Sequence, residues 1–239
     1  MTIRPLTEIA EFQGCVLLQR EAWGSADIDI RPVTLFVTQS HIGGLVLGAF
    51  DGDRLVGFIN ATPGIRNGMP YWHSQMMAIT KDHWNSGIGS QLKLAQMDYA
   101  RQRGLRLIEW TYDPLESKNA HLNIKKLGAI VRRYYVNLYG EITSRLQQGL
   151  ESDRVVAEWW IDQPRVRIEG DIRRVCIPGD IQALKQQSVA SAKEVQRRVR
   201  EEFLKNFQED YFVAGFERRK DEWSEYLFMR GASGVYQTD

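Results

Sequence analysis

The chain begins with short apolar runs separated by turns and by helices whose apolar residues lie three or four positions apart. Asp51-Gly52-Asp53 lies between two apolar runs and predicts the turn of a β-hairpin. After Gly89, the residues Leu92, Ala95 and Tyr99 share one helix face. The predicted strands span residues 2–6, 44–51, 55–61, 71–80, 105–112, 129–138 and 153–161, and the predicted helices begin near Thr7, Val33, Ile88 and Ser117. This order predicts a mixed α/β fold with a central hairpin rather than a repeated βαβ barrel.

Gln163-Pro164 is a predicted boundary between a first domain, residues 1–163, and a C-terminal unit, residues 164–239. The C-terminal unit repeats the strand, helix and hairpin order of about the first 60 residues, either as a half-copy or by chance. Because so small a unit buries its own sheet poorly, we expect it to pack on the first domain or on a second subunit, as in a homodimer. Its predicted elements are a strand over 171–177, one long helix after Asp180, and a hairpin over 211–217 and 224–230.

Composition and charge remove several classes of function. A hydrophobic share of 43% with 26% charged residues is typical of a globular protein, and a net charge of +1 gives no electrostatic reason to expect nucleic acid. Cys15 and Cys176 lie far apart, and neither C-x-x-C nor H-E-x-x-H occurs, so we expect no metal site and a reduced, cytoplasmic protein. Polar residues and glycines interrupt the uncharged stretch 32–50, so no membrane span is expected.

Residues 79–91 join a predicted strand to a predicted helix through a turn that contains Gly87 and Gly89. The N–H groups at the start of a helix have no partner within the helix, and the helix dipole attracts negative charge there. The stretch therefore predicts a phosphate cradle, although the two glycines are also compatible with nothing more than a tight loop. A Walker A loop requires Gly-Lys-Ser/Thr, and a Rossmann fingerprint requires a third glycine where Leu92 stands, so neither motif fits.

Gly87-Ile88-Gly89 resembles the second half of the Arg/Gln-x-x-Gly-x-Gly/Ala pyrophosphate loop of the GNAT superfamily of acyl-CoA-dependent N-acyltransferases. Trp84 stands where that pattern has Arg or Gln. The resemblance extends to about Ile161 and suggests a divergent bacterial branch. It implies a GNAT-type central mixed sheet flanked by helices, with the C-terminal βαββ unit resembling a half GNAT domain.

A second signature of the family is Asn-x-x-Ala, then a Tyr, then Lys-Leu-Gly-Phe. In this chain, Ala120 and the run 126–128 match it, while Ser117 stands at the Asn position and Ile124 at the Tyr position. In many GNAT enzymes that Tyr is the acid that protonates the leaving group, and an apolar side chain cannot donate a proton.

The resemblance implies that the strand over 71–80 binds the pantetheine arm of acetyl-CoA or another acyl-CoA through its backbone. The acyl group would then lie where this strand separates from the strand over 105–112. The implied cosubstrate-binding residues are Met77, Ala78, Ile79, Trp84, Asn85, Ser86, Gly87, Ile88, Gly89, Ser90, Asn119 and Asn123.

Three residues are candidates for catalysis. His121 lies about one helical turn before Ile124 and titrates near neutrality, so it is either an acid or base or merely a surface residue. Glu109 is a carboxylate in an otherwise apolar strand, which indicates either a general base or a buried ion pair. Tyr112 is a possible proton donor or an aromatic wall of the site.

Together these features predict direct transfer of an acetyl or other short acyl group to the amine of a small molecule, such as an amino acid, in a ternary complex. Arg132 and Arg133 suggest a carboxylate on the acceptor or on a succinyl donor, or are simply solvated strand charges. Ile124 and Trp84 favour the alternative, a non-catalytic CoA-binding sensor or subunit with a degenerate site.

Overall fold

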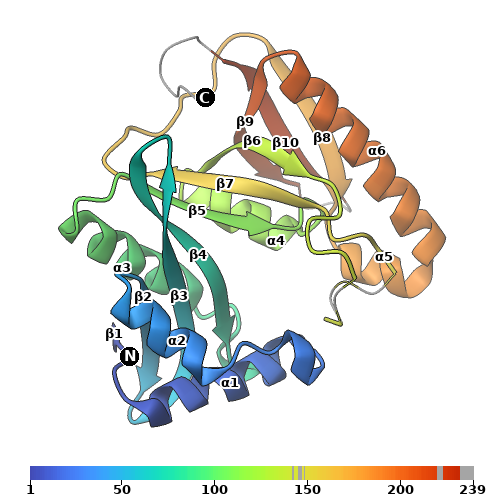
Figure 1. Cartoon of the computed structure of the whole chain (residues 1–239). Helices are drawn as coiled ribbons and strands as arrows, with labels where there is room; N and C mark the ends of the chain where they lie inside the picture. Colours follow the sequence, from blue (N-terminus) through green and yellow to red (C-terminus); the bar gives the residue numbers. More distant parts are fainter. Residues whose placement is uncertain (142, 145–146, 148, 220–222, 232–239) are drawn as a thin grey trace. The chain divides into compact units, whose positions relative to one another are not determined.

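The computed structural model (Figure 1) describes the chain except residues 142, 145–146, 148, 220–222 and 232–239. Its contacts divide the chain into two compact units. Unit one comprises residues 1–110 and short segments beginning at Thr143 and Trp160, and unit two contains the rest. The contacts therefore divide the chain earlier than the boundary predicted at Gln163. One reason is that β6 pairs with β9, at Val131 and Val213, which joins residues on either side of that boundary.

Unit one contains a sheet with the strand order β1-β2-β3-β4-β5. Its neighbours are antiparallel except for the parallel pair β4 and β5. The hairpin predicted around Asp51-Gly52-Asp53 is formed by β2 and β3. The elements are β1 (Thr2–Pro5), α1 (Ile9–Trp23), α2 (Val33–His41), β2 (Leu45–Asp51), β3 (Arg54–Arg66), β4 (Met69–Ile79), α3 (Ile88–Gln102) and β5 (Leu107–Tyr112), with short 3₁₀ turns at Asp27–Asp29 and Lys81–His83.

Helices α1 and α2 cover the hairpin with an aromatic core. The Phe36 ring lies 6.2 Å from that of Phe12 in α1 and 5.7 Å from that of Phe58 in β3. Ala78 of β4 belongs to the same buried cluster. The apolar periodicity of α1 is therefore satisfied against β2, β3 and β4, which fixes the strand that precedes the glycine turn.

Unit two contains strands in the order β7-β6-β9-β10-β8. Helix α6 lies along this sheet (Figure 1). It packs on the sheet through Phe203, whose ring lies 5.0 Å from that of Tyr226 and 4.9 Å from that of Phe228. The elements are α4 (Ser117–Ala120), a π-helical turn (His121–Lys126), β6 (Ile130–Tyr135), β7 (Arg154–Trp160), β8 (Ile172–Pro178), α5 (Ile181–Gln187), α6 (Val189–Gln208), β9 (Tyr211–Arg218) and β10 (Trp223–Arg230).

Three features of unit two differ from the sequence prediction. The single long helix is two helices, because Ser188 is extended and its hydroxyl caps α6 at the Ser191 N–H. The helix after Ser117 widens into a π turn before Gly128 ends it at φ +81°. Finally, β8 pairs with β10, the second strand of its hairpin, whereas β1 pairs with β2, the first strand of its own. The C-terminal unit therefore repeats the element order of the first residues but not their pairing.

A β-bulge in β4 separates the two halves of that strand. Asn60 of β3 pairs with Met76 and Ala61 pairs with Ser74, so Gln75 is an extra residue. The fully buried Asn60 accepts a hydrogen bond from the Met76 N–H at 3.1 Å and donates to the side chain of Gln39 at 2.8 Å. The Asn60 side chain thus provides an acceptor for the Met76 N–H, which the irregular pairing leaves without a partner in the regular ladder.

We expect Asn60→Ala to lower the free energy of unfolding by about 2–4 kcal/mol, because it leaves the Met76 N–H and the Gln39 amide buried without this partner. Denaturant titration measures the effect. Thr62→Val is the control, because it removes only an acceptor of the Gln39 amide. Equal destabilisation by the two variants would show that Asn60 does not hold the bulge.

Candidate active site

Strands β4 and β5 separate after a short stretch of parallel pairing. Among the described residues, the pairing is confined to Trp72 with Ile108 and His73 with Glu109. The next rung would join Ser74 to Trp110, and it is absent from this pairing, while β4 continues through its bulge to Ile79. The expected separation of these two strands is therefore present, and it begins immediately before the bulge.

Helix α3 starts where β4 ends, after a turn with two residues at positive φ. Asn85 has φ +61° and Gly87, the N-cap, has φ +89°. No side chain caps the helix, and its first backbone hydrogen bond runs from the Gln91 N–H to the Gly87 carbonyl at 3.1 Å. The N–H groups of residues 88–90 therefore precede the helical ladder, as an anion site at a helix start requires.

The two glycines of the turn have different roles. A Cβ on Gly87 would meet no atom within 4 Å, so its positive φ rather than crowding accounts for the residue. A Cβ on Gly89 would lie 3.3 Å from both Ile79 Cδ1 and Met77 Cε. Gly89 thus lets the first turn of α3 pack closely on β4.

Trp84 folds back onto the end of β4. Its indole Nε1 donates to the Ile79 carbonyl at 2.9 Å, although 54% of the residue is exposed. In the same loop, the Ser86 hydroxyl donates to the His83 carbonyl at 2.6 Å. These side chains stabilise the loop, and the Ser86 N–H also donates to the His83 carbonyl, at 3.4 Å. The amides of residues 88–90 precede the helical ladder and suit an anion best.

Glu109 forms a buried ion pair, which is one of the two alternatives that the sequence indicated for it. Its side chain is 3% exposed and forms a short ion pair with Arg66 of β3, whose side chain is 14% exposed. On β5, Glu109 and Trp110 point to opposite faces of the strand. The Glu109 carboxylate is therefore held on the face of β5 opposite Trp110.

The other two predicted catalytic residues lie in unit two, so the structure does not bring all three together within one unit. Burial raises the pKa of Tyr112, which is 5% exposed and is thus a neutral phenol at ordinary pH. His121 is half-buried at the start of the π turn. Burial, and then the charges of Lys126, Arg218 and Lys125, lower the pKa of His121, so its imidazole is neutral near pH 7.

The remaining predicted positions of unit two differ in exposure. Asn119 is exposed, whereas Asn123 is buried in the π turn. Ile124, at the position of the family's Tyr, is 3% exposed. Because its side chain is aliphatic, Ile124 cannot serve as a proton donor.

A model of the GNAT acetyltransferase family matches residues 12–128. That range contains the Gly87 turn, the separating strands and the helix that starts at Ser117. The chain contains a GNAT acetyltransferase domain. No curated protein matches the chain.

Solved structures share the fold of this GNAT domain. Aminoglycoside 6'-acetyltransferase type Ii has 20% sequence identity over 70% of this chain and 100% of that chain, with a TM-score of 0.55. The ribosomal-protein-S18-alanine N-acetyltransferase from Escherichia coli has 14% identity over 71% and 99%, with a TM-score of 0.54. An aminoglycoside 6'-N-acetyltransferase complexed with coenzyme A has 16% identity over 70% and 100%, with a TM-score of 0.53. The predicted GNAT fold class is thus confirmed.

Sequence reasoning missed Lys93 of the GNAT domain. Its ammonium group donates to the Ser74 hydroxyl at 3.0 Å and lies 3.5 Å from the centroid of the Trp110 ring. The residue is 3% exposed, and burial lowers its pKa well below the ordinary lysine value. A sequence signal existed, because Lys93 directly follows Leu92 on the apolar side of α3, together with the buried Gln96.

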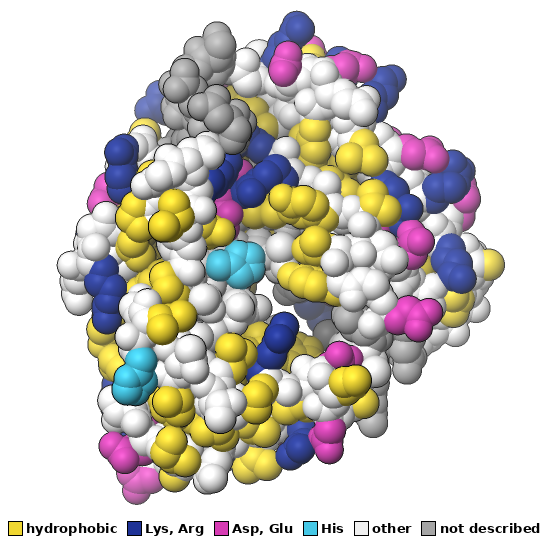
Figure 2. Space-filling model, viewed as in Figure 1, with side chains coloured by type: hydrophobic (Ala, Val, Ile, Leu, Met, Phe, Trp, Pro, Cys, Tyr) yellow, Lys and Arg dark blue, Asp and Glu magenta, His cyan; other side chains and the backbone are white. Residues whose placement is uncertain are grey.

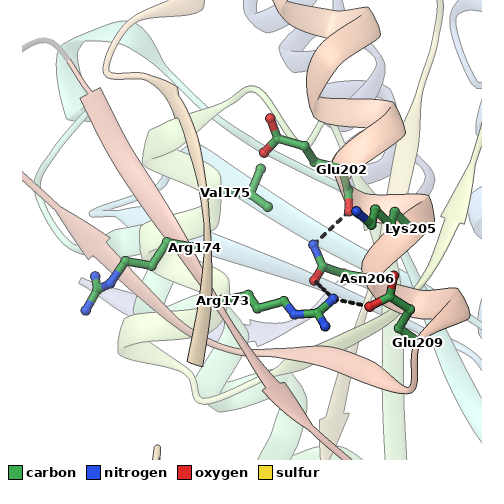
Figure 3. Close-up of a pocket in the computed structure, with 7 residues that line it drawn as sticks. All are labelled: Arg173, Arg174, Val175, Glu202, Lys205, Asn206 and Glu209. Carbon is green, nitrogen blue, oxygen red and sulfur yellow. Dashed lines mark hydrogen bonds and ion pairs between the residues drawn. The ribbon is translucent and has the colours of Figure 1, made fainter. Parts of the chain in front are cut away.

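A surface hollow in unit two contains none of the predicted site residues (Figure 3). Its charges are partly paired, since Arg173 lies 2.5 Å from Glu209 and also donates to Asn206. Figure 2 likewise shows Lys and Arg side chains interspersed with Asp and Glu on the visible face. The residues that line the hollow are Arg173, Arg174, Val175, Glu202, Lys205, Asn206 and Glu209.

Two further searches concern the described residues alone. No group of three or more His, Cys, Asp and Glu side chains among them is arranged to hold a metal ion. None of the described helices combines the length and the apolar character needed to cross a bilayer.

We expect Arg66→Met to cost about 3–5 kcal/mol of stability, because it removes the cation paired with the buried Glu109 carboxylate. Adding Glu109→Gln should recover part of the loss. Arg54→Met is the control, because its pair with Asp82 is exposed and should contribute less than about 1 kcal/mol. Denaturant titration of the three variants checks this, and similar losses for Arg66 and Arg54 would contradict it.

Proposed function

We propose that the chain transfers an acetyl group from acetyl-CoA to the amine of a small molecule, such as an amino acid, directly in a ternary complex. The observation that carries this proposal is the separation of β4 from β5 next to the uncapped start of α3. A separation of that kind suits the pantetheine arm, and the amides at the start of α3 suit a pyrophosphate. The coenzyme A bound to a structure of similar fold supports the same cosubstrate.

In this proposal, the amides of residues 85–90 bind the pyrophosphate, and the backbone of Met77, Ala78 and Ile79 lies along the pantetheine. Asn119 and Asn123 are assigned to the cosubstrate through the family resemblance. Ala78 is 3% exposed and packs in the α1–α2 core, so its contribution is through its backbone. In this proposal, most of the binding energy comes from main-chain groups. Cosubstrate binding therefore does not require the Arg or Gln that Trp84 replaces.

The acyl group we favour is acetyl rather than succinyl. Arg132 lies 2.5 Å and Arg133 3.4 Å from the carboxylate of Glu158, which is fully buried. The two arginines are therefore engaged by a carboxylate of the protein itself. A second carboxylate on the donor would have to compete with Glu158 for them.

His121 is the base that we propose for the acceptor ammonium. A neutral imidazole accepts a proton, and the lowered pKa keeps His121 neutral at physiological pH. Glu109 is a weaker candidate because it is bound to Arg66. A homodimer and a cytoplasmic location stay predictions.

The second candidate function is a CoA-binding sensor or subunit without transferase activity. The buried Ile124 at the position of the family's Tyr favours it. Cosubstrate binding is common to both functions, and turnover distinguishes them.

Gly87→Glu should abolish binding of CoA and acetyl-CoA in calorimetric titrations where the wild type binds at micromolar concentration. The variant places a carboxylate beside the expected pyrophosphate. Gly87→Gln is the matched control, because it imposes the same backbone strain, about 1–2 kcal/mol, without the charge. Succinyl-CoA should bind no better than acetyl-CoA. If the wild type binds none of the three, both candidate functions are wrong.

His121 should set the acidic limb of the pH profile of kcat/KM. Because its pKa is lowered, the rate should rise with pH through a midpoint below the ordinary histidine value of 6.5. His121→Gln should remove this limb and lower the rate about 10²–10⁴-fold. His41→Gln, at the exposed end of α2, is the control. An unchanged acidic limb in His121→Gln would assign the base to another residue.

A further inference from the structure

Lys93 stands at the point where β4 and β5 part. Trp72 pairs with Ile108 and His73 with Glu109, so the next rung would join Ser74 to Trp110. Lys93 of α3 contacts both members of that rung, through a hydrogen bond to Ser74 and through the face of the Trp110 ring. The Lys93 amine therefore lies where the backbone pairing of β4 and β5 stops.

A protonated Lys93 is a buried charge without an ion-pair partner in the described part of the chain. Among the described residues, no carboxylate lies within ion-pair distance of Nζ, whose contacts are a neutral hydroxyl and an aromatic face. Burying an ammonium group costs free energy unless it is paired, and a Ser hydroxyl with a cation–π contact offsets only part of that cost. Uncompensated charges of this kind are found where a negative charge develops during a reaction.

The proposed transfer creates such a charge and leaves it without a partner. When the acyl group moves from the thioester to an amine, the CoA sulfur departs as a thiolate. Ile124, at the position of the family's Tyr, has an aliphatic side chain and therefore offers no proton. The expected acyl position is the separation of β4 and β5, and Lys93 lies where that separation begins.

We propose that Lys93 receives the thioester end of acyl-CoA and protonates its sulfur as the acyl group leaves. The inference rests on the proposed function. The nitrogen of the acceptor amine bonds to the carbonyl carbon of the thioester, the carbon–sulfur bond breaks, and sulfur keeps the electron pair. The Lys93 ammonium gives sulfur a proton, which forms CoA thiol. The acceptor nitrogen loses one proton to the base before it attacks and a second as the amide forms, and this second proton returns to Lys93.

The surroundings of Lys93 suit a proton donor. Burial lowers the pKa of Lys93 well below the ordinary lysine value, so proton transfer from its ammonium group to sulfur is less unfavourable. The Lys93 nitrogen lies 3.5 Å from the centroid of the Trp110 ring, and a cation–π contact of this kind stabilises the charged form. The Ser74 hydroxyl fixes the direction of the amine.

The first test measures the thiol of bound CoA and needs no acceptor. In the wild-type complex, a nearby ammonium should lower the thiol pKa by about 1–3 pH units relative to free CoA, followed through thiolate absorbance. Lys93→Met should abolish this difference, and Ser74→Ala should reduce it. Arg103→Met is the control, because Arg103, the C-cap of α3, lies over the Trp72 ring rather than beside Ser74 and Trp110. The same thiol pKa in the wild type and in Lys93→Met would overturn the proposal.

The second test separates this role from simple bracing of the two strands. Lys93→Met should lower kcat about 10²–10⁴-fold, leave KM for acetyl-CoA nearly unchanged, and leave Tm unchanged or raised, because it removes a buried charge. A bracing role predicts a lower Tm and a higher KM with a smaller change in kcat, which would overturn the proposal. If the wild type binds no CoA, the proposed function itself fails. Binding and turnover that survive in Lys93→Met refute only the role of Lys93.

Discussion

The hydrogen bond from the Met76 N–H to the Asn60 side chain maintains the geometry of the candidate site. It satisfies the backbone of β4 at the point where the extra residue Gln75 interrupts its regular pairing with β3. Without an internal acceptor, a buried N–H at that point would favour a regular strand. A regular β4 would have no reason to part from β5 after His73. The bulge, and with it the separation of β4 from β5, depends on a polar side chain fully buried in the neighbouring strand.

The helix start depends on the same strand. The Thr80 N–H donates to the Val56 carbonyl at 2.9 Å, which ties the end of β4 to β3. From there, positive φ at Asn85 and Gly87 turns the chain, and Gly89 lets α3 return closely along β4. The amides of the first turn and the ammonium of Lys93 are therefore placed by one helix against one strand. Their relative positions are set by packing rather than by the loop.

Local patterns in the sequence predicted the elements and the glycine turn. Apolar periodicity and turn residues depend on neighbours in the chain, so the hairpin and α3 were predictable. The bulge at Gln75, the Arg66–Glu109 pair and the contacts of Lys93 depend on register between strands distant in sequence. A shift of one residue would reverse the face of each side chain. The same limit explains why the pairing of β8 with β10 and the contacts that divide the chain at Trp110 were not predicted.

The buried charges of the two units show why Lys93 differs from a structural ion. In unit two, the Arg200 guanidinium lies 2.8 Å from the fully buried carboxylate of Asp153, and Arg132 lies 2.5 Å from that of Glu158. In unit one, Glu109 has Arg66. In each case a partner offsets the cost of burial, and removing it would be strongly destabilising. The buried amine of Lys93, in contrast, contacts only a neutral hydroxyl, that of Ser74, and the indole ring of Trp110 among the interactions described. A fold selected for stability alone would place an apolar side chain there, and this is why we assign Lys93 to the negative charge that the proposed transfer creates on sulfur.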